Sequence, residues 1–349
     1  MRAFRQPSPV HANKIEARFP NALRNRPRRS KLRGWADRKN SGRKALKRKM
    51  ADLITRFRKL AKYMLPYGLS TLPDTLRARS AREVERALLD RFGVNGALRG
   101  RHAGKRCFIL CTGPSIKAQN LRRLAGELVI SVSNAYLHPD YEIFSPIYHC
   151  VPHMTFGAFT EADAVQWLRE MDERLGQAEL FLSDEQRTLV TARGLLMHRP
   201  VHYLCMQGDV PAQLPGAAPD LTARLPRPQS VPVMALMVAL YMGCKDIYLL
   251  GTDHDYFLTG KYTYFFEKSL TSEKDPSVGE GGRVLASRYD QFHELTSLWR
   301  QYRWLKTCCA GGDVTIYNAT AGGALDEFER VDFAALRLAG DSHASAVAF

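Results

Sequence analysis

The stretch from residue 227 to residue 262 constrains the fold of this chain more than any other. An apolar segment from Val231 to Met242 follows a run of polar residues and stops at Gly243, which predicts a buried helix with a glycine end. A short apolar run, Ile247 to Leu250, then predicts a buried strand. Ligands of open parallel α/β sheets lie at the carboxyl ends of strands, so we expect the chemistry in the loop from Gly251 to Tyr262. This loop contains Asp253, His254, Asp255, Tyr256, Lys261 and Tyr262.

Strand and helix patterns alternate through most of the chain after residue 105. Strands are expected at 106–111, 128–132, 147–151, 179–182, 201–204, 247–250 and 314–317, and helices at 80–92, 117–124, 161–175, 184–193, 231–242 and 289–305, with a long loop at 207–229. This alternation predicts an α/β fold with a doubly wound, mostly parallel sheet. No GxGxxG sequence follows any expected strand, so a dinucleotide fingerprint is excluded.

The charge of the chain is concentrated at its start. The whole sequence has 51 Lys and Arg against 35 Asp and Glu, yet residues 1–106 alone hold 30 of the basic and 7 of the acidic residues. We therefore expect three parts: a disordered basic tail at 1–41, a basic amphipathic helix and helical linker at 42–100, and a catalytic domain at 101–340. Within that domain, a lid is expected near 267–286, just after the predicted site, where its closure would exclude water.

The expected basic helix at 43–65 has apolar residues at helical spacing opposite a face of Lys and Arg. Such a helix suits an anionic membrane surface, and docking on the domain or contact with nucleic acid are the alternatives. No run of 18 apolar residues occurs, so a membrane-spanning helix is not expected. We expect a cytoplasmic protein that is peripheral on the inner face of the cell membrane, with no specific nucleic-acid partner and with a homo-oligomer left open.

Four expected strand ends carry polar groups to one edge of the sheet. They are Thr112 to Ser115, Asn134, Gly251 to Tyr262, and Asn318 to Thr320. Amides and hydroxyls dominate this set, which favours binding of a polar, nucleotide-linked ligand over acyl chemistry. Neither a GxSxG elbow nor a GxxxxGK[ST] loop is present in the sequence.

The triplet Asp253-His254-Asp255 allows two interpretations. Two carboxylates separated by one residue can share a hard cation such as Mg²⁺. Alternatively, His254 could act as a general base, since the unperturbed pKa of histidine suits removal of a proton from a hydroxyl. His153 and His293 compete for that role.

Several motifs carry a resemblance to a known superfamily. Residues 108–117 read Phe-Ile-Leu-Cys-Thr-Gly-Pro-Ser-Ile-Lys, and Ser230 to Tyr262 contains a helix followed by Ile-Tyr-Leu-Leu-Gly-Thr-Asp. Residues 318–324 read Asn-Ala-Thr-Ala-Gly-Gly-Ala. In this order the motifs resemble the superfamily that joins bacterial sialyltransferases, motility accessory factor glycosyltransferases and hydroxymethylpterin pyrophosphokinase-like (MptE-like) proteins. The resemblance implies a Rossmann-like fold of the GT-A-variant sialyltransferase type.

The resemblance also implies roles for individual residues. The nucleotide of a CMP-sugar would be held by Gly113, Pro114, Ser115, Asn134 and Ser230, with Thr112, Gly251, Asp253, Asn318 and Thr320 as further binding candidates. Tyr256 and Tyr262 would donate hydrogen bonds to the departing phosphate, and Arg227 would support the same charge. These donors need no metal to stabilise a leaving phosphate.

Two departures from the family pattern concern catalysis. The family's catalytic histidine follows the lid, whereas residues 284–288 contain no histidine, so His254, Asp255 or His293 is the candidate base. The spacing from Asp253 to Tyr256 is one residue longer than in the family.

The sequence therefore predicts a glycosyltransferase that moves an anionic sugar, of sialic or other nonulosonic acid type, from a CMP-sugar to a surface glycan or protein, with no metal cofactor required. One alternative is a pyrophosphokinase-like enzyme for a pterin-like substrate that uses ATP and Mg²⁺ held by Asp253 and Asp255. The other is an inactive nucleotide-binding scaffold.

Overall fold

The computed structural model describes residues 72–154, 159–210, 218–274 and 277–341. The chain divides into two compact units, Met1–Ala78 and Arg79–Phe349. Helix α3 (Leu72–Phe92) begins in the first unit, and all other described elements belong to the second. The predicted basic tail at 1–41 and basic helix at 43–65 lie outside the described residues.

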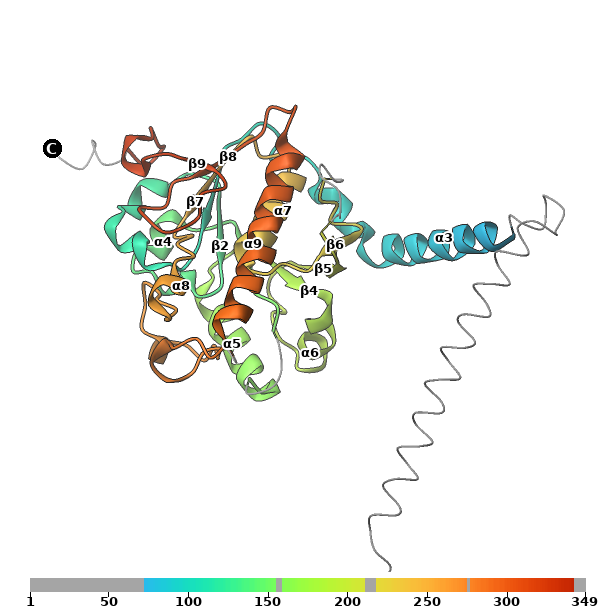
Figure 1. Ribbon diagram of the computed structural model, residues 1–349, viewed down its shortest axis with the longest axis horizontal. Helices are drawn as coiled ribbons and strands as arrows, with labels where there is room; N and C mark the ends of the chain where they lie inside the picture. Colours follow the sequence, from blue (N-terminus) through green and yellow to red (C-terminus); the bar gives the residue numbers. More distant parts are fainter. Residues whose placement is uncertain (1–71, 155–158, 211–217, 275–276, 342–349) are drawn as a thin grey trace, which may run out of the picture. The chain divides into compact units, whose positions relative to one another are not determined.

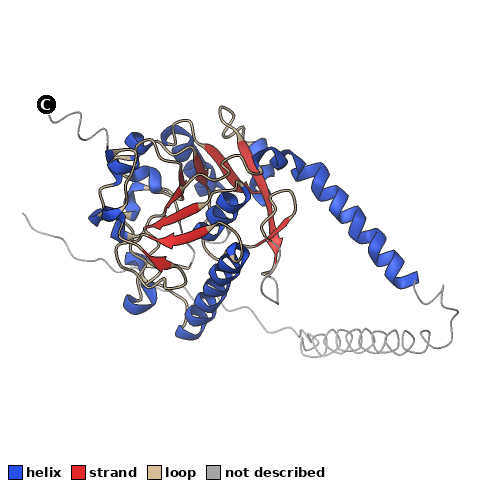
Figure 2. Cartoon of the chain, turned by 90° about the horizontal axis from the view of Figure 1, so that it is seen from above, coloured by secondary structure: helices blue, strands red, loops and turns tan. Residues whose placement is uncertain are grey.

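The second unit is built on one parallel sheet. Within the described residues it has nine strands in the order β6-β5-β4-β3-β2-β1-β7-β8-β9, and every neighbouring pair is parallel. Helices flank it on both sides (Figure 2). The predicted α/β fold with a doubly wound parallel sheet is confirmed. The strands are β1 (Cys107–Leu110), β2 (Val129–Val132), β3 (Tyr148–Cys150), β4 (Glu179–Ser183), β5 (Val201–Gly208), β6 (Arg224–Pro226), β7 (Asp246–Leu250), β8 (Thr315–Asn318) and β9 (Glu329–Arg330).

Two hydrophobic clusters cover the two faces of the sheet. Along β1, Cys107 and Ile109 point into one cluster, while Phe108 and Leu110 point into the other. The first cluster includes residues of α7 (Val231–Tyr241) and α9 (Arg288–Cys309), which Figure 1 shows on the same side of the sheet. The second includes residues of α4 (Tyr141–Phe144), α5 (Glu161–Arg174) and α6 (Arg187–Ala192). Strands buried on both faces explain why continuous apolar runs marked them in the sequence.

The helix α7 at the centre of the first cluster is apolar all round. Of its 11 residues, nine are buried, including Pro232 and Tyr241. A helix buried on every side fits between sheet and α9 without a polar stripe. The helix expected at 231–242 is thus confirmed. None of the helices in the described ranges is long and apolar enough to span a membrane.

The helix expected at 117–124 is wrong. The structure has two short 3-10 helices there, η2 (Pro114–Ala118) and η3 (Leu121–Leu124), separated by the extended backbone of Gln119. Ile116, Leu121 and Leu124 are all fully buried, so packing against the sheet sets the course of the chain over local helix propensity.

The prediction of a long loop at 207–229 is also partly wrong, because this range contains strand residues. It includes the last residues of β5 and the short strand β6, whose Leu225 is buried. Pro226 lacks an N–H and is tolerated because β6 lies at the edge of the sheet. The other edge strand, β9, was not predicted either, since Glu329 and Arg330 are exposed and charged.

Candidate functional site

The sheet reverses its strand order between β1 and β7, which are neighbours in space. Ligands of doubly wound sheets bind at such a switch point, outside the carboxyl ends of the strands. Here the ends of β1 and β7 are joined by a hydrogen bond from Gly113 N to Gly251 O at 2.9 Å. The predicted site loop and the Gly-Pro-Ser turn are therefore brought together at the switch point.

Glycine is required at position 113 because the two turns approach so closely. A Cβ atom there would lie 1.8 Å from Asp253 Oδ2 and 2.5 Å from Gly251 O. Gly251 itself has φ +67°, and its Cβ would lie 2.6 Å from Ile116 Cγ2. The glycines thus permit the contact between the two turns.

Asp253 fastens the two turns to each other. Its carboxylate accepts hydrogen bonds from Ser115 Oγ at 2.8 Å and from Ser115 N at 3.3 Å. Burial raises the pKa of the Asp253 carboxyl, and the Ser115 hydroxyl lowers it. Both side chains are therefore engaged in holding the turn after β1 against the turn after β7.

Asn318 and Thr320 hold the turn after β7 in place through hydrogen bonds. Thr252 N donates to Thr320 Oγ1 at 3.1 Å, and Thr320 N donates to Asn318 Oδ1 at 3.0 Å. Gly323 packs directly on Asp253, whose carbonyl oxygen accepts from Ala324 N at 2.7 Å. Neither Asn318 nor Thr320 lines a cavity of the site, so their contacts explain the Asn-Ala-Thr-Ala-Gly-Gly-Ala motif as a support.

A cavity of about 250 Å³ lies at this edge of the sheet. The predicted site residues among those that line it are Thr112, Gly113, Ser230, Gly251, Asp253, His254, Asp255, Tyr256 and Tyr262. Pro114 and Ser115 belong to η2 and do not line this cavity. The structure thus brings most of the predicted residues into one place.

The two predicted tyrosines lie against each other in this cavity. Their rings stack with centroids 4.1 Å apart, and Tyr256 is buried at the start of α8 (Tyr256–Thr259). Burial raises the pKa of Tyr256, and the neighbouring Tyr262 hydroxyl lowers it. The Tyr256 phenol therefore stays protonated near neutral pH, as a hydrogen-bond donor requires.

Ser230 is the N-cap residue of α7, but its side chain makes no hydrogen bond to the helix and instead lines the cavity. Its loop is fixed by Gln301 of α9, whose side chain accepts from Gln229 N and donates to Arg227 O, both at 2.7 Å. The amino end of a helix favours an anion through its free N–H groups and dipole. The amino end of α7 presents such a dipole to the cavity.

The candidate bases occupy different environments. His254 has φ +49° and its Nε2 lies 2.7 Å from the Tyr302 hydroxyl, while burial lowers the pKa of His254 to about 4. Asp255 is half-buried in the cavity wall and makes no capping bond to α8. His293 is exposed on α9, stacks on Tyr289 and lines neither cavity of the site.

Asn134 is fully buried at the end of β2 and is tied to the segment expected as a lid. Its Oδ1 accepts from Tyr136 Oη at 2.9 Å, Trp167 Nε1 at 2.7 Å and Thr271 Oγ1 at 3.1 Å. Its Nδ2 donates to the carboxylate of Glu273, which lines the cavity. Asn134 therefore reaches the cavity through Glu273, a residue that the sequence analysis missed.

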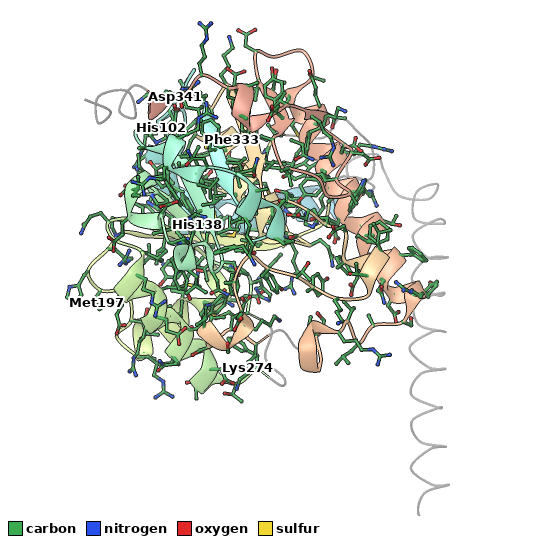
Figure 3. The ribbon with its side chains drawn as sticks, turned by 90° about the vertical axis from the view of Figure 1, so that its left-hand side faces the viewer. His102, His138, Met197, Lys274, Phe333 and Asp341 are labelled. Carbon is green, nitrogen blue, oxygen red and sulfur yellow. The ribbon has the colours of Figure 1, made fainter. Side chains whose placement is uncertain are left out.

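Residues 271–274, which we call the strap, are anchored on both sides of Glu273. Ser272 N donates to Glu170 Oε2 at 3.0 Å, and Lys274 Nζ pairs with Asp163 Oδ1 at 2.6 Å. Figure 3 shows Lys274 at the opposite end of the sheet domain from His102, which precedes β1. The strap thus lies along the carboxyl edge of the sheet, against α5.

A second cavity, of about 600 Å³, adjoins the first, and both are lined by Pro152, Gln229, Ser230 and Val231. Arg227 lines this larger cavity and not the smaller one; its guanidinium is 3.0 Å from Glu185, and its side chain is 55% exposed. Glu185 also lies 3.3 Å from His153 Nε2. The structure therefore places Arg227 apart from the two tyrosines.

The residues present fit a metal poorly. No group of three or more His, Cys, Asp or Glu side chains in the described part of the chain could hold a metal ion. Within the predicted Asp253-His254-Asp255 triplet, the Asp253 carboxylate is held by Ser115.

Comparison with known proteins finds likeness among solved structures. No family model matches the chain, and no curated protein does. The chain is similar to the MAf glycosyltransferase from Magnetospirillum magneticum AMB-1, with 18% identity and a TM-score of 0.41 over 71% of this chain and 37% of that one. It is also similar to the sialyltransferase CstII from Campylobacter jejuni in complex with cytidine-5'-monophosphate, with 16% identity and a TM-score of 0.40 over 66% of this chain and 85% of that one. Both of these solved structures are glycosyltransferases, and this chain spans about 37% of the length of the first.

Proposed function

We propose that this protein is a glycosyltransferase that takes an anionic sugar, of sialic or other nonulosonic acid type, from a CMP-sugar. The observation that carries the proposal is the shared wall of the smaller cavity. Tyr256, Tyr262 and Ser230 line one space at the switch point between β1 and β7, next to the amino end of α7. Three hydroxyls and a helix dipole form a site for a phosphate.

The chemistry follows from these donors. The bond between the donor sugar and the phosphate oxygen breaks, and CMP leaves with the electron pair while the acceptor oxygen bonds to the sugar. Negative charge grows on the phosphate during this step. The Tyr256 and Tyr262 hydroxyls and the Ser230 hydroxyl donate to it, which lowers the barrier because they are fixed before the reaction begins.

The remaining residues have supporting roles in this proposal. The turn at Thr112 and Gly113 lets the nucleotide approach the backbone, and the contact between Asp253 and Ser115 keeps that turn in place. Asp255 receives the proton of the acceptor hydroxyl, since it lines the cavity beside Tyr256 and is half-buried. His254 is a poorer candidate because its Nε2 is already engaged by the Tyr302 hydroxyl at 2.7 Å.

The experiment is release of CMP from CMP-N-acetylneuraminic acid by the full chain, with water as the acceptor and EDTA present. We expect CMP to appear faster than in the absence of protein, and the CMP to protect the protein against thermal unfolding. A thermal shift with ATP and Mg²⁺ but none with CMP would instead support the pyrophosphokinase alternative. If none of CMP, CDP, UDP and ATP stabilises the protein against thermal unfolding, the inactive scaffold is favoured.

Residues 43–65 enter the proposal from the sequence alone. We propose that their basic amphipathic pattern brings the enzyme to an anionic membrane surface, where each Lys or Arg contributes about 1 kcal/mol. Full-length protein should float with vesicles that contain phosphatidylserine and not with neutral phosphatidylcholine vesicles. Replacing both Lys59 and Lys62 with Glu should weaken this flotation; unchanged flotation would contradict the proposal.

A further inference from the structure

The larger cavity shares part of its wall with the proposed donor site. Gln229, Ser230 and Val231 at the amino end of α7 belong to the walls of both cavities, as does Pro152 after β3. Ligands in the two cavities would therefore both lie next to Ser230. At about 600 Å³, the larger cavity is also within the range of sites for small organic ligands, roughly 300–1,000 Å³.

The wall of the larger cavity is rich in charged and amide groups and poor in aromatic rings. The residues that line it include two arginines, Arg227 and Arg300, and one carboxylate, Asp209. No Trp, Tyr or Phe lines it among the described residues, so stacking of a sugar on an aromatic face is not how it would bind. Guanidinium groups instead recognise carboxylates and phosphates through paired hydrogen bonds.

The two arginines approach the cavity from different elements. Arg227 follows β6, and its backbone is held by the bond from Gln301 Nε2 to Arg227 O at 2.7 Å. Arg300 comes from α9, one residue before Gln301, and is exposed. Glu185 lies within 3.0 Å of the Arg227 guanidinium, so an incoming anion would exchange with a carboxylate already present in the protein.

We propose that the larger cavity is the acceptor site and that it takes a sugar bearing a carboxylate or phosphate group, held by Arg300 and Arg227. This assignment rests on the proposed function, because it names the second substrate of the same reaction. The acceptor would reach the donor across Ser230 and Gln229, where the two cavities meet.

The test measures binding of four probes to the full chain by isothermal titration calorimetry. The charged probes are 3'-sialyllactose and glucose 6-phosphate, and their neutral partners are lactose and glucose. We expect at least one charged probe to bind about tenfold or more tighter than its neutral partner, in line with one charge-assisted hydrogen-bonded pair. Which probe gains identifies carboxylate or phosphate. No preference in either pair, including no binding at all, overturns the proposal.

Substitution of one arginine separates this site from the donor site. Arg300→Gln should remove the preference for the charged probe, Arg300→Lys should keep part of it, and neither should change the affinity for CMP. Arg303→Gln is the matched control, since Arg303 lies one turn further along α9 and pairs with Glu327. An Arg300→Gln variant that keeps the full preference would overturn the assignment.

The proposed function fails separately from this inference. If CMP does not bind while the charged probe does so through Arg300, the cavity remains a site for anionic sugars and the CMP-sugar donor is wrong. If CMP binds and no charged probe is preferred, the donor proposal stands and the acceptor assignment is wrong.

Discussion

The turns that end β1, β7 and β8 differ from the segments that surround them. In the turns, polar groups bind one another: Ser115 binds Asp253, and Thr252 binds Thr320. In the surrounding segments, Ser230, Tyr262 and Glu273 line the smaller cavity. The difference separates residues that hold the edge of the sheet together from residues that can meet a ligand, although both kinds are polar and all of them except Glu273 belong to the sequence motifs.

Substitutions in the turns should have the greatest effect on stability. Gly113→Ala should cost about 3 kcal/mol or more in the free energy of unfolding, because its Cβ would overlap the Asp253 carboxylate and the Gly251 carbonyl. Urea denaturation would measure the loss. Gly312→Ala is the control, since its Cβ would meet only Cys309 O at 3.7 Å. A Gly113→Ala protein as stable as the control would contradict the close packing of the turns.

The second prediction concerns His254 at the junction between the two regions. Its folded pKa of about 4 lies below the ordinary value of 6.5, so the unfolded chain binds the proton first as the pH falls. The free energy of unfolding keeps the full contribution of neutral His254 above pH 6.5. It falls by about 3 kcal/mol as the pH decreases from 6.5 to 4. Buried His149, with a pKa of about 3, acts in the same direction.

His254→Asn tests this prediction, because asparagine tolerates the positive φ and does not titrate. The drop in unfolding free energy from pH 7 to pH 4.5 should be smaller than in the wild type, whatever the variant's stability at pH 7. His198→Asn, at an exposed position, should leave the drop unchanged. An equal drop in all three proteins would show that His254 does not resist protonation.

The third prediction concerns Tyr262, which lines the smaller cavity. Tyr262→Phe should slow CMP release about 100-fold, as loss of one donor to a developing charge does elsewhere, and should also weaken CMP binding because CMP carries the same phosphate. Its stacking with Tyr256 is kept by the phenylalanine ring, so stability should hold. Tyr289→Phe, at an exposed position of α9, should leave the rate unchanged. Wild-type turnover in Tyr262→Phe contradicts its role at the phosphate.

The smallest expected effect is a gain. The Glu273 carboxylate places a negative charge in the cavity proposed for a phosphate, so Glu273→Gln should tighten CMP binding about tenfold. Glutamine keeps an acceptor for Asn134 Nδ2, which preserves the strap. Glu267→Gln, exposed on the same segment and outside the cavity, should bind CMP like the wild type. Weaker or unchanged binding in Glu273→Gln would mean that Glu273 assists the ligand or does not meet it.

The sequence predicted the fold and the approximate place of the site because both depend on local patterns. Apolar runs marked β1 and β7, and polar residues after each strand marked their carboxyl ends. The edge strand β6 was missed because Arg224 to Pro226 carries no such run.

Contacts between distant residues could not be predicted in the same way. The hydrogen bond between Asn134 and Glu273 joins residues 139 positions apart, and the one between Gln229 and Gln301 joins residues 72 positions apart. No local sequence pattern predicts either pair. Asn318 and Thr320 looked like ligand groups because their residue types are polar. Their burial behind Thr252 depends on how β8 packs beside β7, which only the fold decides.

The most direct test of the central claim is a crystal structure of the full chain with CMP. We expect the CMP phosphate to lie in the smaller cavity, with the Tyr262 and Ser230 hydroxyls at about 2.7–3.1 Å from its oxygens. CMP bound instead in the larger cavity against Arg227 and Arg300, or away from the switch point between β1 and β7, would contradict it.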